Sequence, residues 1–480
     1  MKNKIKAFYL ILNNFFKVLE KKDQFKFFYF LFFSVLNTLL EIISLFLLIN
    51  LLFIIAEINT GTSEIFEVLY RLINRSPILY STILMLSVVI FKFMFQTIYS
   101  YEQERFGYNV QKKISQKVYN TILNSEYLDY LKFNSSNITR MLNSDLIRIN
   151  NQLISPIISI LNELLLIVSV CLLIFTYNFL LGISTLLFSI TIIFVFILSI
   201  NKKLKFYSKE SILYSTKMIK HILESHKAYL TVNLFGVKTS FVEKFDAIID
   251  KYVKYGHKTI FLLKLPKNLF ELIIFLSISI LIFTLYFLNK TELIVEYIGI
   301  LSVATFKLIP SLNKLSTSIQ AIQYFSKPFT EILFFLKLKN VEINSFKKIE
   351  NFQKIKYNNL SFSYDGGTKV LGENNLEIFK NDFIGIVGES GSGKSTLINL
   401  LSGLIYSKNI EVILDDCLIQ SHELRSLCSI VQQETVILDQ TIYVNIALEF
   451  DSNKIDKYRI NNLLKQVNLY YPLKDKLDQS

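Results

Sequence analysis

The residues whose types and spacing most clearly indicate chemistry form the run Gly388-Glu389-Ser390-Gly391-Ser392-Gly393-Lys394-Ser395-Thr396. It fits the pattern G-x-x-x-x-G-K-[ST], in which glycines let the backbone turn tightly and successive N–H groups converge on phosphate oxygens. Lys394 can reach the outer phosphates of a nucleotide, and the Ser395 hydroxyl can ligate Mg²⁺. The run predicts a phosphate-binding loop; the alternative is a chance glycine-rich turn.

The flanking residues predict the elements that must position this loop. Before it stands the short apolar run Phe383-Ile384-Gly385-Ile386-Val387, which predicts a buried strand. After it, residues 395–404 carry leucine and isoleucine at helical spacing, which predicts a helix with one buried face. The start of a helix adds the positive end of its dipole to a phosphate site. Strand, glycine turn and helix are the context that the motif requires.

The composition indicates a membrane protein. The chain has 480 residues, of which 51% are hydrophobic, and a mean hydropathy of +0.39. Its formal charge of +13 is explained by Lys and Arg in cytoplasmic loops, so no nucleic-acid partner is expected. The scattered Cys171, Cys417 and Cys428 predict neither a disulfide framework nor a metal site.

Six apolar stretches are each near or above the ~20 residues that a helix needs to cross a bilayer. They are residues 27–56, 78–101, 156–176, 179–200, 269–288 and 293–312, and residues 1–22 predict a preceding helix in the membrane interface. The long segments 102–153 and 201–267 are rich in Lys and Arg, and the other links are not. The positive-inside rule therefore predicts a multi-pass protein with both termini cytoplasmic, and we expect it in the plasma (inner) membrane. The long segments are polar but periodic, which predicts helices that continue beyond the bilayer.

Composition also divides the chain into domains. Residues 1–337 predict an all-α, six-helix transmembrane domain, residues 338–351 a linker, and residues 352–480 part of an α/β nucleotide-binding domain. Ionisable residues inside the spans are costly, and we expect them to pair with one another, face a wet cavity or snorkel. They are Glu41, Lys92, Glu163, Glu271, Glu296 and Lys307.

Six spans followed by a phosphate-loop domain resemble the ATP-binding-cassette (ABC) exporters, in the fused half-transporter form. Leu360-Ser361-Phe362-Ser363-Tyr364 is similar to the family's adenine-stacking loop, with Tyr364 as the ring; a core or turn tyrosine is the alternative. Ile430-Val431-Gln432-Gln433-Glu434 resembles the Q-loop, with Gln433 reaching magnesium. The resemblance implies ATP and Mg²⁺ as cofactors, with Ser395 and Gln433 as magnesium ligands. The implied nucleotide-binding residues are Tyr364, Gly388, Ser390, Gly391, Ser392, Gly393, Lys394, Ser395, Thr396 and Gln433.

The membrane half carries the same resemblance. His221 to Ser225, followed by Phe235-Gly236-Val237 and Phe241, is similar to a cytoplasmic coupling segment that docks on the nucleotide domain. Residues 265–271 and 304–313 resemble the bacterial lipid-linked oligosaccharide flippases. These likenesses imply a homodimer, or a partner subunit, and a lipid or lipid-linked substrate, with peptide, polysaccharide and drug export as alternatives.

The sequence departs from the family pattern after the Q-loop. Glu411-Val412-Ile413-Leu414-Asp415-Asp416 lies too early to be the Walker B strand, and we interpret Asp415 and Asp416 as turn residues. The later motifs of the family do not follow: the Leu-Ser-Gly-Gly-Gln signature, the Walker B strand, the catalytic glutamate and the switch histidine. No catalytic residue is therefore assigned. Because the strands that would flank the phosphate-loop strand are also missing, part of the sheet's apolar face is expected to be uncovered. Two hypotheses remain: an exporter whose missing half is supplied elsewhere, or a truncated, non-hydrolysing nucleotide binder or decayed gene product.

Overall fold

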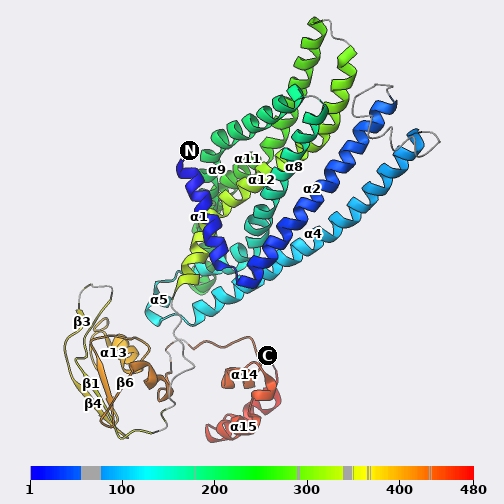
Figure 1. Ribbon diagram of the computed structural model, residues 1–480. Coiled ribbons are helices and arrows are strands. Elements are labelled where there is room, and N and C mark those ends of the chain that lie inside the picture. The colour runs from blue at the N-terminus through cyan, green and yellow to red at the C-terminus, as the bar shows by residue number, and fades with distance from the viewer. Residues whose placement is uncertain are drawn as a thin grey trace. The chain divides into compact units, whose positions relative to one another are not determined.

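The computed structural model describes residues 2–55, 77–177, 179–288, 292–338, 349, 351–364, 367, 369–431, 433 and 435–479. The chain divides into two compact units, Met1–Ile343 and Asn344–Ser480. The first is built from long helices and the second contains the strands (Figure 1). The predicted class, a helical membrane domain followed by an α/β domain, is confirmed. Most of the expected linker lies outside the described residues.

Long helices make up the first unit because its apolar runs are interrupted by few turn residues. Their bounds are α1 Lys2–Val18, α2 Lys21–Ile55, α4 Pro77–Leu123, α8 Ser155–Tyr177, α9 Phe179–Lys227, α11 Lys238–Phe287 and α12 Glu292–Lys337. Within the described residues, five helical segments are long and apolar enough to cross a membrane, and they fall in α2, α4, the helical run Ser135–Tyr177 that ends with α8, α11 and α12. The fourth expected span, 179–200, forms the first part of α9. The helices run on past the apolar stretches, as predicted.

The connection between α4 and α8 is a chain of short helical turns. It comprises α5 Tyr127–Lys132, α6 Ser135–Arg140, a π-helical turn Met141–Asp145, α7 Leu146–Ile149 and a second π-helical turn Asn150–Ile154. The buried Arg140 guanidinium donates to the carboxylates of Asp145 and of Glu331 on α12. A buried charge needs such partners, so this contact joins the first π-helical turn to α12.

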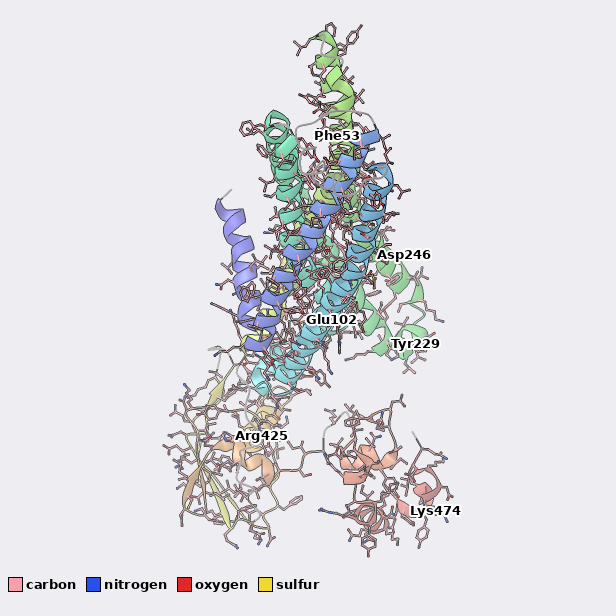
Figure 2. All side chains as sticks on the ribbon, turned by 45° about the vertical axis from the view of Figure 1, so that its right-hand side comes forward. Phe53, Glu102, Tyr229, Asp246, Arg425 and Lys474 are labelled. Atoms are coloured by element: carbon pink, nitrogen blue, oxygen red, sulfur yellow. The ribbon has the colours of Figure 1, made fainter. Side chains whose placement is uncertain are left out.

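The connection between α9 and α11 is the short helix α10, Tyr229–Leu234. Gly236, with a φ of +68°, turns the chain into α11. Tyr229, labelled in Figure 2, Leu234 and Phe235 present exposed apolar side chains in this connection. Next to this connection, Nε2 of His221 on α9 lies 2.9 Å from the carbonyl oxygen of Phe241 on α11, and this contact joins the two helices.

Four of the six ionisable residues expected inside the spans form ion pairs, which confirms the structural interpretation for them. The buried Glu41 carboxylate on α2 contacts Lys307 on α12 and lies 3.0 Å from Lys92 Nζ on α4. The buried Glu163 carboxylate on α8 lies 3.1 Å from Nζ of Lys314 on α12. Helix α12 thus carries the basic partner of two acidic side chains.

An antiparallel sheet forms the centre of the second unit. Its order is β4-β1-β5-β6, from β1 Lys354–Asn358, β4 Leu376–Phe379, β5 Glu411–Leu414 and β6 Cys417–Ile419. A separate pair joins β2 Phe362–Ser363 to β3 Lys369–Leu371. The apolar core beside the sheet comprises the buried side chains of Ile355, Tyr357, Leu360, Val412 and Leu424.

Helices and short helical turns complete this unit. They are α13 Lys394–Leu401, α14 Ile442–Ala447, α15 Lys457–Gln466 and α16 Tyr470–Leu473, with 3₁₀ turns at Ser421–Ser426, Ser452–Lys454 and Lys474–Lys476. Tyr443, Ile460, Leu464 and Leu477 form a second small core among the last of these helices.

The predicted strand before the phosphate loop is the main correction. Residues 383–387 form no strand, and the side chains of Phe383 and Val387 are almost completely exposed. An apolar run is buried as a strand only where neighbouring strands pair with its backbone groups, and no described residue pairs with this run. The expectation of an uncovered apolar face is consistent with this exposure.

Candidate phosphate-binding site

The predicted phosphate loop forms a tight turn directly before α13. Gly391 and Gly393 have φ values of +85° and +94°, a region that glycine enters without steric cost. A Cβ on Gly393 would lie only 3.0 Å from the Val370 side chain on β3, so the loop also packs closely against that strand. Gly393 caps α13, which aims the N-terminal N–H groups of the helix toward the loop.

Lys394 lies across this loop. Its ammonium donates to the carbonyl oxygens of Gly388, at 2.8 Å, and of Glu389, at 2.7 Å. An ammonium has three N–H donors, so these two contacts fix its position while leaving donor capacity for an anion. The positive charge thus lies beside the backbone N–H groups of the loop, as phosphate binding requires.

Tyr364 and Thr396 are brought together beside the loop. The Tyr364 hydroxyl lies 3.1 Å from Thr396 Oγ1, and its ring packs edge-on against Phe362 with 4.9 Å between the ring centroids. The Tyr364 side chain is 40% exposed, which leaves part of its π-face open for stacking. Ser395, the first hydroxyl after the lysine, is exposed at the start of the helix.

Two supports of α13 were not predicted from the sequence. The buried Tyr357 on β1 donates its hydroxyl to the carbonyl oxygen of Leu401 at 2.8 Å, and burial raises the pKa of Tyr357, which keeps this donor neutral. Arg425, labelled in Figure 2, donates through Nε to the carbonyl oxygen of Gly403 at 2.8 Å. Both contacts satisfy carbonyl groups near the C-terminal end of the helix. Only the short hydrophobic alternation around Tyr357 signals its burial in the sequence.

The structure does not join Gln433 to the phosphate loop. Its side chain is exposed, and no contact within the described residues links it to residues 388–396. The run that follows it is ordered locally: Thr441 caps α14, and the Asn445 side chain donates to the carbonyl oxygens of Leu438 and Gln440. Asn445 therefore stabilises the turn before α14.

Asp415 and Asp416 are turn residues, as predicted. They connect β5 to β6 with φ values of 45° and 66°, which aspartate tolerates better than most residues. The Asp415 carboxylate accepts hydrogen bonds from the backbone N–H groups of Gln353 and Lys354 at the start of β1. Its oxygens are thereby used to join two strands, and this supports the rejection of a Walker B role.

The donor set fits the phosphates of a nucleotide. It combines backbone N–H groups, one ammonium and the start of a helix, all of which favour anions. Ser395 presents one exposed hydroxyl at the start of α13, and Mg²⁺ beside a nucleotide usually takes few protein ligands and completes its shell with phosphate oxygens and water. The described residues contain no cluster of three His, Cys, Asp or Glu side chains that could hold a metal without a nucleotide.

Comparisons with known proteins agree with both units. The family profile "ABC transporter transmembrane region" matches residues 27–306, and the profile "ABC transporter" matches residues 371–480. An export ATP-binding/permease protein of Rickettsia prowazekii is 24% identical over 76% of this chain and 65% of its own length. An ATP-dependent lipid A-core flippase of Haemophilus ducreyi is 28% identical over 55% of this chain and 47% of its own length. The chain thus spans less than two thirds of these relatives.

A solved structure shows the same fold. The structure of a bacterial Atm1-family ABC exporter with ATP bound superposes with a TM-score of 0.75 at 16% sequence identity, covering 96% of this chain and 79% of that one. The transmembrane profile alone matches more than half of the 480 residues. The protein therefore belongs to the ABC transporter family, and it has the fused membrane and nucleotide-binding domains of an ABC exporter.

Proposed function

We propose that this chain binds MgATP at residues 388–396 and uses it to move an amphipathic or lipid-linked substrate across the inner membrane. The observation that carries the proposal is the Lys394 ammonium, held across a glycine turn at the start of α13. Tyr364 is proposed to stack on the adenine, and Ser395 and Gln433 to ligate Mg²⁺. The lysine-rich links support a topology with both termini cytoplasmic.

We further propose that the hydrolytic half of the site is supplied outside these 480 residues. The sequence holds no Leu-Ser-Gly-Gly-Gln run and no acidic Walker B end that could orient water. In the family that the chain belongs to, the phosphate loop of one subunit closes on the signature of the other. A homodimer, or a partner subunit, is the corresponding assembly.

The substrate class is proposed from the membrane unit and from one relative. A lipid A-core flippase matches about half of this chain. The acid–base pairs that α12 forms with Glu41 and Glu163 lie within or beside apolar stretches. Charged groups at this depth pair with one another or line a polar path between the helices, and such a path would suit a substrate with a charged or sugar headgroup.

Nucleotide binding tests the proposal directly. Lys394→Ala is expected to weaken binding of a fluorescent ATP analogue by roughly 10- to 100-fold, because a charge-assisted hydrogen bond is worth about 1.5–3 kcal/mol. The matched control is Lys408→Ala, which removes an exposed lysine of the same unit. Equal affinities of the two variants would contradict the assignment of the loop.

A non-hydrolysing nucleotide-binding membrane protein is the second candidate. It is favoured by residues 383–387, which directly precede the phosphate loop in the sequence. This run stays exposed and forms no strand, so the sheet that would support the loop is incomplete. Supplying a polypeptide that carries a signature and a Walker B strand distinguishes the two functions. An exporter half-site should then release phosphate in a Lys394-dependent manner, and a non-hydrolysing binder should not.

A further inference from the structure

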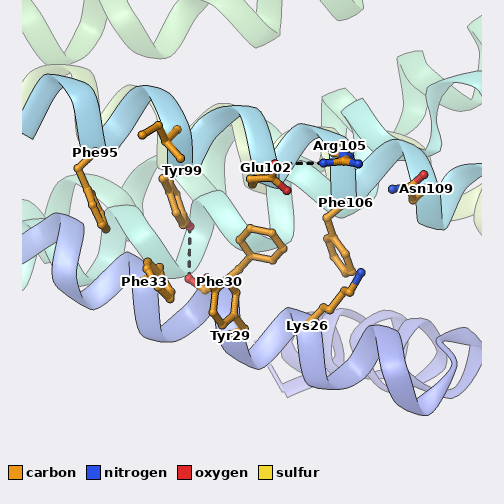
Figure 3. A pocket seen from close by; sticks show the side chains of 11 residues that line it. Lys26, Tyr29, Phe30, Phe33, Phe95, Tyr99, Glu102, Arg105, Phe106 and Asn109 are labelled. Carbon is orange, nitrogen blue, oxygen red and sulfur yellow. Dashed lines mark hydrogen bonds and ion pairs between the residues drawn. The ribbon is translucent and has the colours of Figure 1, made fainter.

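A cavity of about 450 Å³ lies between α2 and α4 of the first unit (Figure 3). Helix α2 contributes Lys26, Phe30 and Phe33, and α4 contributes Phe95, Glu102 and Arg105. The lining residues of each helix recur every three or four positions, so one face of each helix forms one wall. Sequence reasoning did not identify this cavity, because it depends on two helix faces meeting.

The walls change from apolar to charged along the helices. Phe33 and Phe95 stand inside the apolar stretches 27–56 and 78–101, and their rings stack with centroids 6.0 Å apart. Lys26 and Arg105 stand just beyond the same two stretches. At 1.5 Å per residue, the charged end is roughly 10–15 Å from the aromatic end. These dimensions match a lipid headgroup with the first part of its acyl chains.

The charged end carries an excess of positive charge. Arg105 forms an exposed pair with Glu102, at 3.3 Å, which leaves Lys26 on the facing helix as a second cation. Among the described residues, no carboxylate lies within salt-bridge distance of Lys26, whereas the nearby Lys113 contacts both Glu20 and Asp23 at 2.7 Å. Two cations against one carboxylate favour a ligand with a single negative charge.

The cavity is accessible from the side that faces the bilayer. Ile98 and Tyr29 belong to its lining, and their side chains are 63% and 52% exposed. Both residues lie inside the apolar stretches, so in a bilayer their exposed side chains would meet lipid, and an acyl chain could enter without separating the helices. Phe30, Tyr99 and Phe106 are buried behind them and form a fixed apolar wall.

We propose that this cavity binds one anionic phospholipid from the surrounding bilayer. Its phosphate lies between Lys26 and Arg105, and its acyl chains follow Phe33 and Phe95. The site shares no residue with the nucleotide loop and requires no turnover, so it stands whether or not the proposed transport function holds.

The absence of tryptophan from the sequence allows a direct test. Phe95→Trp introduces one fluorophore into the cavity wall, and Phe275→Trp introduces one at an exposed position of α11. Each full-length variant is placed in bilayers that contain either brominated phosphatidylglycerol or brominated phosphatidylcholine. The anionic lipid should bind about 5-fold more favourably than the zwitterionic lipid at Phe95→Trp, because one net charge near a membrane surface contributes about 1 kcal/mol. Phe275→Trp should show no preference.

Charge variants assign the preference to the cavity. Lys26→Gln combined with Arg105→Gln should abolish the preference for the anionic lipid. Lys267→Gln, which removes an exposed lysine just before the fifth span, should leave that preference intact. Ile98→Trp serves as a second reporter if Phe95→Trp does not fold. Equal quenching by both lipids, a preference that survives the double variant, or loss of the preference on adding inorganic phosphate or a soluble anionic amphiphile would overturn the proposal.

Discussion

The carboxylate of Asp415 shows how environment decides the role of a residue. By type and sequence context it could hold magnesium, yet it accepts three hydrogen bonds from the backbone N–H groups of Gln353 and Lys354. Lys394, by contrast, is held by two carbonyl oxygens that carry no formal charge. The aspartate is therefore committed to the sheet, and the ammonium remains suited to phosphate.

Asp415→Ala should loosen the start of β1 without changing nucleotide binding. Loss of the charged acceptor is expected to speed amide exchange of Gln353 and Lys354 by about tenfold, since such hydrogen bonds contribute about 1–2 kcal/mol at an exposed position. Hydrogen-exchange mass spectrometry of the full chain measures this effect. Asp416→Ala is the control. It also places alanine at a position of positive φ in the same turn, but it removes no contact to β1. A changed Mg²⁺ dependence of ATP binding in Asp415→Ala would restore a metal-binding role.

Glu41 occupies a position where a neutral side chain should be costly. Its carboxylate is the shared partner of Lys92 and Lys307. Glu41→Gln leaves two ammonium groups without this counter-charge and is expected to destabilise the membrane unit by about 3 kcal/mol. Lys92→Met should cost less, because the Glu41–Lys307 pair survives.

Thiol labelling during thermal unfolding measures this difference. Cys171 is buried in α8 and reports on unfolding once Cys417 and Cys428 are replaced by serine. Glu243→Gln, which neutralises an exposed carboxylate on α11, is the matched control and should leave the midpoint unchanged. A shift for Glu41→Gln no larger than that for Lys92→Met would show that the carboxylate is not the centre of the cluster.

The packing of α4 against the second π-helical turn depends on Gly107. A Cβ at this position would lie 1.9 Å from Oδ1 of the buried Asn150, whose amide donates to Glu104 on α4 at 2.8 Å. Gly107→Ala should therefore destabilise the membrane unit by about 2 kcal/mol. Adding Asn150→Ala should recover part of this loss, because it vacates the clashing space.

Gly256→Ala in α11 provides the comparison. Its added methyl group would meet only Ser211 Oγ, at 4.0 Å, and alanine favours helix by up to about 1 kcal/mol over glycine. The unfolding midpoint should fall for Gly107→Ala and stay equal or rise for Gly256→Ala. Equal unfolding midpoints for Gly107→Ala and Gly256→Ala would mean that α4 and the second π-helical turn separate easily at this contact.

Across the molecule, features set by local sequence could be predicted, and features set by distant partners could not. The apolar stretches, the phosphate loop and the turn at Asp415 depend on a few consecutive residues. The burial of residues 383–387 was predicted wrongly, because it depends on strands elsewhere that pair with it. The partner of Glu163, the contact between Arg140 and Glu331, and the cavity between α2 and α4 all join residues that are far apart in the sequence.

The central claim is that the phosphate loop holds MgATP while the residues that cleave it come from outside these 480 residues. The most direct test measures nucleotide binding and phosphate release on one preparation of the full chain in lipid nanodiscs. We predict saturable, Mg²⁺-dependent binding that Lys394→Ala removes, with phosphate release no higher than in that variant. Phosphate release by the unmodified chain that Lys394→Ala abolishes would contradict this account.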